Sequence, residues 1–178
     1  DWYTVLIGVT AFLVLMLHGS LWVNLKSSGD LQTRARTLAK GLVWIAGAAA
    51  VAISFASFSV QPQLWTSFSR NPLLWAFPLV GVAGLLAIAF SLSSNRDAAA
   101  FGGSVTFIAG LLCSAAFGLF PVLLPAVPDA SLSLTVYNTG APAYGLAIGF
   151  WWWTPAFLLA VGYSVFIYHR FRGKVEVG

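Results

Sequence analysis

Five long apolar stretches, separated by polar connections, decide what this chain can fold into. They cover residues 2–25, 38–60, 72–93, 101–124 and 144–168. Each is at least as long as the roughly 20 residues that an α-helix needs to cross the hydrocarbon core of a bilayer. The pattern predicts an all-α integral membrane protein with five transmembrane helices.

The composition agrees with a membrane protein and argues against other classes. Hydrophobic residues make up 59% of the 178 residues and charged residues only 8%, which is too little polar surface to cover a water-soluble particle. The net charge of +4 does not indicate a nucleic-acid partner, because the basic residues flank the spans and face lipid headgroups. The expected surroundings are membrane lipid, with no nucleic acid.

The basic residues also predict the orientation of the chain. When alternate connections are assigned to alternate faces, eight of the nine Lys and Arg residues fall on one side and only Arg70 on the other. The eight are Lys26, Arg34, Arg36, Lys40, Arg96, Arg170, Arg172 and Lys174. Because cytoplasmic connections carry the excess of Lys and Arg, we expect the Asp1 end outside and the carboxyl tail in the cytoplasm.

Short connections make consecutive helices antiparallel neighbours. We therefore expect the first four spans to form a four-helix transmembrane bundle and the fifth to be one further transmembrane helix, packed outside the bundle or against another subunit. The chain starts at Asp1, without a signal sequence before the first span. Residues 1–178 are interpreted as a single transmembrane region, the carboxyl-terminal half of a longer polytopic subunit; an engineered fragment or a removed signal is the alternative.

Local signals predict helix starts and helix contacts. Asp30 and Asp97 occupy expected N-cap positions of the second and fourth helices, and Asn71 precedes a proline at the expected start of the third. Small residues recur at intervals of four, a spacing that lets two helix backbones approach closely in lipid. They are Ala46, Ala50 and Ser54 on the second helix, and Gly110, Ser114 and Gly118 on the fourth.

His18 is the best candidate for chemistry inside the membrane. It lies about two-thirds of the way through the first span, where an ionisable group is a functional hypothesis by default. It could bind haem iron, relay protons or hydrogen-bond a neighbouring helix. A haem site needs a second ligand or an open iron position, and only His169 and Met16 are further candidates. We therefore favour the structural role.

The sequence lacks the residues that other kinds of chemistry need. The spans contain no carboxylate, and no sequence pattern fits a phosphate loop, a zinc site or an activated nucleophile. The sequence predicts no catalytic, cofactor-binding or metal-ligating residue.

The connection between the fourth and fifth spans, residues 121–142, is longer than a hairpin needs. Pro121, Pro125 and Pro128 end the helix, and the Asp, Ser, Asn and Gly residues that follow favour an ordered loop with Asx turns. We expect Tyr137 and Asn138 to anchor this loop. The Asn side chain would bind backbone groups of the turn, and the Tyr ring would cover helix ends.

These residues resemble a known family. Three segments resemble the second half of cytochrome bd quinol oxidase subunit II. They are the end of the first span with His18 and Trp22, the loop with Thr135, Tyr137 and Asn138, and the closing Thr154-Pro155. The resemblance extends over essentially the whole chain and includes the tail as far as Val175. The stretch Thr139-Gly140-Ala141-Pro142 departs from the family pattern.

The resemblance implies a non-haem structural subunit of a quinol:oxygen oxidoreductase in the aerobic respiratory chain. In such a heterodimer, subunit I holds haems b and d, and subunit II stabilises subunit I. This chain would bind no haem, although a structural quinone or lipid is possible. Expected partners are subunit I, its own amino-terminal half and small accessory subunits. The implied location is the bacterial or archaeal cytoplasmic membrane, that is, the cell inner membrane.

Within that role, the candidate structural or interface residues are His18, Trp22, Thr135, Tyr137 and Asn138. Two alternatives stay open. The chain could be one repeat half of a membrane transporter, which would need unwound helices or charges at the bilayer midplane. It could also be a haem-binding electron-transfer subunit that uses His18, which would need a convergent second ligand.

Overall fold

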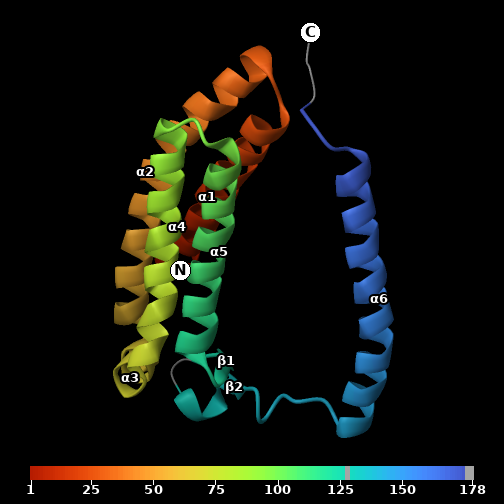
Figure 1. Ribbon diagram of the computed structural model, residues 1–178. Coiled ribbons are helices and arrows are strands. Elements are labelled where there is room, and N and C mark those ends of the chain that lie inside the picture. The colour runs from red at the N-terminus through yellow and green to blue at the C-terminus, as the bar shows by residue number, and fades with distance from the viewer. Residues whose placement is uncertain (127–128, 175–178) are drawn as a thin grey trace. The chain divides into compact units, whose positions relative to one another are not determined.

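The computed structural model describes residues 1–126 and 129–174. The chain is 82% helical, and five of its helices are long and apolar enough to cross a membrane, so the predicted all-α membrane class is confirmed. Figure 1 shows the elements in order: α1 Trp2–Lys26, α2 Gly29–Val60, α3 Pro62–Arg70, η1 Pro72–Trp75, α4 Ala76–Ser93, α5 Asp97–Leu119, β1 Val122–Leu124, η2 Ala130–Leu132, β2 Leu134–Thr135 and α6 Ala143–Arg170.

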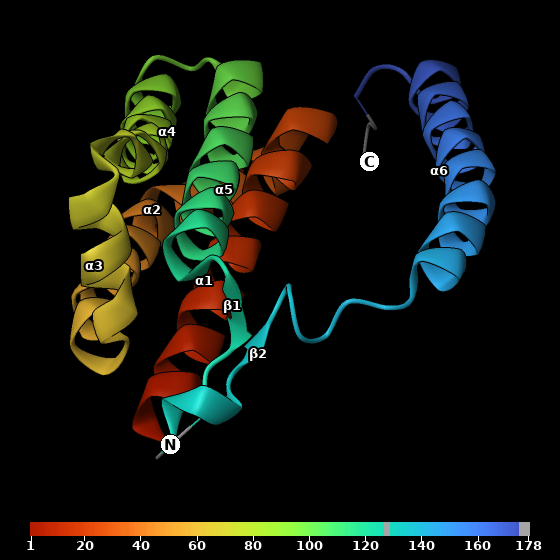
Figure 2. The same cartoon turned by 90° about the horizontal axis from the view of Figure 1, so that it is seen from below.

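The chain divides into two compact units. The first contains Asp1–Phe120 and the second Pro121–Gly173. In the first unit, α1 packs against α2 and α5, and α4 packs against the same two helices, so four helices close into a bundle (Figure 2). This is the predicted four-helix arrangement, with α6 as the further helix in the second unit.

The bundle core lies where these four helices meet. Its apolar side chains come from all of them, and Leu17, Leu21 and Ile88 are completely shielded from solvent. Two tight turns bring the helices together. Gly29 has φ +69° between α1 and α2, and Asn95 has φ +57° between α4 and α5, in the left-handed region that Gly and Asn tolerate best.

Helices α4 and α5 cross at backbone distance. A Cβ atom added to Gly84 would lie 2.5 Å from the backbone nitrogen of Phe107, and one added to Gly110 would lie 2.4 Å from that of Gly81. Only glycine leaves room for such a contact. Lipid supplies no hydrophobic driving force between helices, so close packing of this kind holds α4 and α5 together. The four-residue spacing of small side chains predicted a contact at Gly110 but not at Gly81 and Gly84 on the opposite helix.

Several helix boundaries differ from the predictions. Helix α5 ends at Leu119, five residues before the end of the predicted span 101–124, and residues 122–124 form a strand instead. Pro121 lacks a backbone N–H and cannot continue the helix. A short helix, α3, fills the connection before Asn71 and was not predicted.

One of the three predicted N-caps is confirmed and two are wrong. Asn71 caps η1, with its side chain accepting a hydrogen bond from the Leu73 backbone N–H at 3.2 Å. The caps assigned to Asp30 and Asp97 are wrong, because the N-cap residues of α2 and α5 are Ser28 and Arg96. Both carboxylates lie in the first helical turn and bind arginines instead.

The second unit consists of a small sheet, a turn and one long helix. Strands β1 and β2 pair antiparallel. Val122 lies opposite Thr135 and Leu124 opposite Leu134, with a bulge between Val122 and Leu124. Helix α6 continues through Pro155 and buries none of its residues. The predictions that involve Pro128 and Val175 lie outside the described residues.

Candidate functional site

The His18 side chain links two helices inside the membrane-spanning part of the bundle. Its Nδ1 lies 2.8 Å from the Ser104 hydroxyl oxygen on α5, and its ring packs 4.8 Å from the ring of Phe101. Ser104 itself is buried, with 1% exposure. The hydrogen bond to a neighbouring helix, which was the favoured interpretation of His18, is therefore present.

Trp22 extends this contact toward the basic end of α1. Its ring lies 5.1 Å from that of Phe101, and the Lys26 ammonium lies 5.4 Å above the indole. A cation over an indole face is attracted by the negative potential of the ring. One turn apart on the same helix, His18 and Trp22 thus enclose Phe101 of α5.

A second polar group, around Asp97, joins three helices at the end of the bundle where the α1–α2 and α4–α5 connections meet. Its carboxylate accepts from Arg36 Nη2 at 2.7 Å and from Asn24 Nδ2 at 2.9 Å, both at Oδ1. Gln32 Nε2 donates to Oδ2 at 3.0 Å. Arg36 also donates to the Asn95 side-chain oxygen in the turn.

The Asp97 group is largely shielded from solvent. The side chains of Arg36 and Asp97 are 22% and 17% exposed, and Asn24 is completely buried. The exposed pair of Arg34 and Asp30, on the same helix as Arg36, is 79% and 76% accessible by contrast. Because shielding from water strengthens charge-assisted hydrogen bonds, the Asp97 group contributes far more to holding the helices together.

Sequence reasoning missed Asp97, Arg36, Asn24 and Ser104 as a set. Arg36 was counted only as a basic flank, and Asp97 only as a cap. One signal was available: Asn24 is a polar residue inside an apolar span, one residue from its end, and such a residue needs a partner. The identity of that partner, 73 residues away, depends on the bundle.

The outer loop is organised around Asn138. Its side-chain oxygen accepts from the Thr135 backbone N–H at 2.6 Å, and its amide nitrogen donates to the Ser133 carbonyl at 3.0 Å. The Thr135 hydroxyl oxygen in turn accepts from the backbone N–H groups of Tyr137 and Asn138. The prediction that the Asn138 side chain binds backbone groups of the turn is confirmed.

Tyr137 lies in the loop and is 77% exposed. That its ring covers helix ends stays a prediction. Further along the loop, hydrogen bonds from Ser131 lower the pKa of the Asp129 carboxyl below its usual range. Side-chain bonds to the backbone around Asn138 and Asp129 therefore contribute to the order of the loop.

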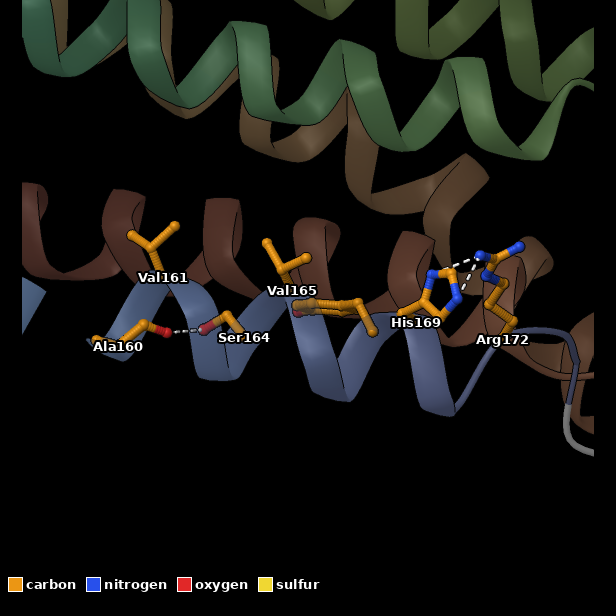
Figure 3. A pocket seen from close by; sticks show the side chains of 7 residues that line it. Ala160, Val161, Ser164, Val165, His169 and Arg172 are labelled. Atoms are coloured by element: carbon orange, nitrogen blue, oxygen red, sulfur yellow. Dashed lines mark hydrogen bonds between the residues drawn. The ribbon is translucent and has the colours of Figure 1, made fainter. Parts of the chain in front are cut away.

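The last turn of α6 carries a smaller polar feature. An open groove along one side of this helix runs past Val161 and Val165 to His169 and Arg172 (Figure 3). Arg172 Nη2 lies 2.8 Å from Nε2 of His169, as the dashed lines in Figure 3 mark. His169 is thus engaged with an arginine, which is no environment for a metal cation.

The described residues do not gather a set of metal-ion ligands. No group of three or more His, Cys, Asp or Glu side chains gathers among residues 1–126 and 129–174. Met16 lies two positions from His18, about 200° round the helix, and cannot act as its axial counterpart.

Comparison with known proteins points to one family. The sequence profile described as "Cytochrome bd terminal oxidase subunit II" matches residues 1–171. The chain is similar to "Probable cytochrome oxidase subunit 2" of Haemophilus influenzae, with 26% identity covering 98% of this chain and 53% of that protein. It is also similar to "Cytochrome bd ubiquinol oxidase subunit 2" of Bacillus subtilis, with 27% identity covering 98% of this chain and 51% of that protein.

A third relative matches a shorter region. "Cytochrome bd-I ubiquinol oxidase subunit 2" of Escherichia coli is 24% identical over 61% of this chain and 29% of that protein. The chain spans about half the length of the first two relatives.

Proposed function

Because the chain belongs to the family of cytochrome bd terminal oxidase subunit II, we propose that it is a non-haem structural subunit of a bd-type quinol:oxygen oxidoreductase. In this proposal, haems b and d are held by subunit I. The chain stabilises that subunit in a heterodimer of the respiratory chain. It performs no step of oxygen reduction itself.

One observation carries the proposal. The polar groups in and beside the spans are used to tie helices of the same chain together: His18 binds Ser104, and Asp97 binds Arg36 and Asn24. A redox or proton-transfer site needs groups that remain available to a substrate or an iron atom. The arrangement supports a role in holding a structure.

The partners and the location belong to the same proposal. Helix α6 is long and apolar enough to cross a membrane, which supports contact with lipid, a structural quinone or another protein. Subunit I, the amino-terminal half of the same subunit and small accessory subunits are the proposed proteins. The proposed location is the bacterial or archaeal cytoplasmic membrane, with the Asp1 end outside and the carboxyl tail in the cytoplasm.

Replacing His18 tests the proposal directly. We expect His18→Ala to leave the haem content per purified complex unchanged and to lower the yield, because an interhelical hydrogen bond worth about 0.6–2 kcal/mol is lost. Haem content is read from the difference spectra of the intact oxidase. Ser104→Ala is the matched control, since it removes the same bond from the other side. Selective loss of one haem in His18→Ala alone would contradict a structural role.

A further inference from the structure

The groove on α6 joins an apolar wall to a basic end (Figure 3). Val161 and Val165 line it along the membrane-spanning helix, and His169 and Arg172 line its carboxyl-terminal end. Ser164 also lines it, but its hydroxyl donates to a backbone carbonyl of the same helix at 2.8 Å. The wall is therefore apolar, and the groups that can bind a polar ligand lie at the end.

Arg172 is held at this end by His169. Its Nη2 lies 2.8 Å from Nε2 of the imidazole, and an arginine nitrogen can only donate, so the imidazole nitrogen accepts. Within the described residues, Arg172 bonds through Nη2 alone, which leaves further N–H groups of the guanidinium for an acceptor. A planar guanidinium presents such donors as a fork that matches a phosphate group.

The positive charge at this end lacks a counter-charge in its own unit. Arg170 adds a second guanidinium one residue after His169. Among the described residues of the unit Pro121–Gly173, the one carboxylate belongs to Asp129, in the loop before α6. The 28 residues of α6, about 42 Å of helix, separate that loop from the basic end. An anion that neutralises the basic end must therefore come from outside this unit.

The length of the groove matches one leaflet of a bilayer. From Ala160 to His169 it follows nine residues, or about 14 Å of helix. Half of the hydrocarbon core of a bilayer is about 15 Å thick. With the basic end at the level of the headgroups, the apolar wall reaches the middle of the bilayer.

We propose that the groove binds one anionic phospholipid, with its phosphate on Arg172 and one acyl chain along Val161 and Val165. The inference rests on the proposed function, because it needs α6 to cross the membrane with its carboxyl end at the cytoplasmic headgroups. A zwitterionic headgroup fits less well, since it brings an ammonium group that the guanidinium repels. A phospholipid is favoured over a protein segment because its phosphate and acyl chain reproduce the division of the groove into a polar end and an apolar wall.

Two arginines of equal charge separate a built site from general attraction to the membrane surface. Arg172 lines the groove, whereas Arg170 does not. The full-length tagged subunit is purified in the intact oxidase. Native mass spectrometry then measures the binding of phosphatidylglycerol and of phosphatidylcholine, each added at the same concentration.

We expect the wild-type complex to bind phosphatidylglycerol more tightly than phosphatidylcholine. Arg172→Gln should weaken phosphatidylglycerol binding by about tenfold or more, because charge-assisted hydrogen bonds to the phosphate are lost. Arg170→Gln should weaken it by about twofold or less, the effect of an exposed charge. Equal effects of the two variants, or no preference for phosphatidylglycerol, would overturn the inference.

A tryptophan at position 161 tests the apolar wall. The indole of Val161→Trp would occupy the path of the acyl chain, so we expect phosphatidylglycerol binding to weaken by about tenfold, the effect of losing contact with two methylene groups. Leu159→Trp is the matched control, because position 159 lies at nearly the same depth but about 200° round the helix. Equal binding by the two tryptophan variants would contradict the proposed position of the lipid and overturn the inference.

The outcomes also distinguish this inference from the proposed function. Loss of the haem-bearing partner from Arg172→Gln, at unchanged phosphatidylglycerol binding, would make the groove a protein contact and overturn the inference alone. A wild-type chain that purifies without a haem-bearing subunit would overturn the proposed function. The comparison of Arg172→Gln with Arg170→Gln in that chain would still decide whether the lipid site exists.

Discussion

Asp97 illustrates how one carboxylate can connect elements that are remote in sequence. It accepts hydrogen bonds from Asn24 on α1 and from Gln32 and Arg36 on α2, while itself lying in the first turn of α5. Two of these donors share one oxygen atom, and the guanidinium supplies a charge-assisted bond. Asp97 therefore holds α1, α2 and α5 together at one end of the bundle.

Removing the charge at Asp97 should weaken the bundle. We expect Asp97→Asn to destabilise the protein by roughly 1.5–3 kcal/mol, because Arg36 then remains shielded from water without its carboxylate. Asp30→Asn is the matched control, since its pair with Arg34 is exposed and worth at most about 0.5 kcal/mol. The measurement is the midpoint of heat-induced loss of intact complex in detergent. Equal midpoints for the two variants would show that Asp97 does not stabilise the contact between the helices.

Asn138 should matter to the outer loop in the same way. We expect Asn138→Ala to reduce the amount of assembled oxidase, because two bonds to the backbone of the turn are lost, each worth about 1 kcal/mol. Turnover per haem should stay unchanged. A drop of tenfold or more in turnover per haem, equivalent to about 1.4 kcal/mol of barrier, would instead give the loop a part in the reaction.

At the scale of elements, the contact between α4 and α5 depends on paired glycines. Gly81 and Gly84 on α4 face Gly110 and Gly103 on α5, and no side chain separates the two backbones there. Close packing of this kind is the main attraction between helices in lipid. The two helices are consequently sensitive to the addition of even one methyl group.

A single methyl group therefore provides a test. We expect Gly110→Ala to destabilise the bundle by about 1–3 kcal/mol, because the new Cβ would lie 2.4 Å from the Gly81 backbone nitrogen and must push the helices apart. Gly102→Ala, on the same helix, meets nothing within 4 Å and should be neutral or stabilising by up to about 1 kcal/mol. Thermal midpoints of the two purified variants decide the matter; a Gly110→Ala protein as stable as Gly102→Ala would exclude a tight crossing.

At the scale of the whole molecule, the distribution of basic residues predicts the orientation in the membrane. The structure adds that the connections carrying Lys26 and Arg96 lie at one end of the bundle, since Asn24 and Arg36 both bind Asp97 there. Helix α3 and the connection around Arg70 belong to the opposite end of α2 and α4. The basic end should face the cytoplasm.

Cysteine labelling tests this orientation. In a Cys113→Ala background, we expect cysteines at Ser69 and Ser131 to react with an impermeant thiol reagent added from outside, because both positions are exposed. A cysteine at Ser94, exposed in the turn between α4 and α5, should react only after the membrane is opened. Labelling of position 94 in intact cells would reverse the orientation.

The sequence alone determined the features that depend on local chemistry. Hydrophobic length predicted the five spans, short connections predicted antiparallel neighbours in a four-helix bundle, and Asn138 in a Ser- and Thr-rich stretch predicted a side-chain-bonded turn. The resemblance carried by the segments around His18 and Asn138 pointed to the family that the comparison confirmed.

Only the tertiary structure decided which residues meet across helices. The partner of His18 is 86 residues away and that of Arg36 is 61 residues away, so no periodicity within one span could reveal them. The same holds for Gly84 against Phe107 and for the pairing of β1 with β2. The hydrophobicity of a span is set by its own residues, whereas a hydrogen bond or a backbone contact between helices exists only once the bundle has closed and fixed their rotation and depth.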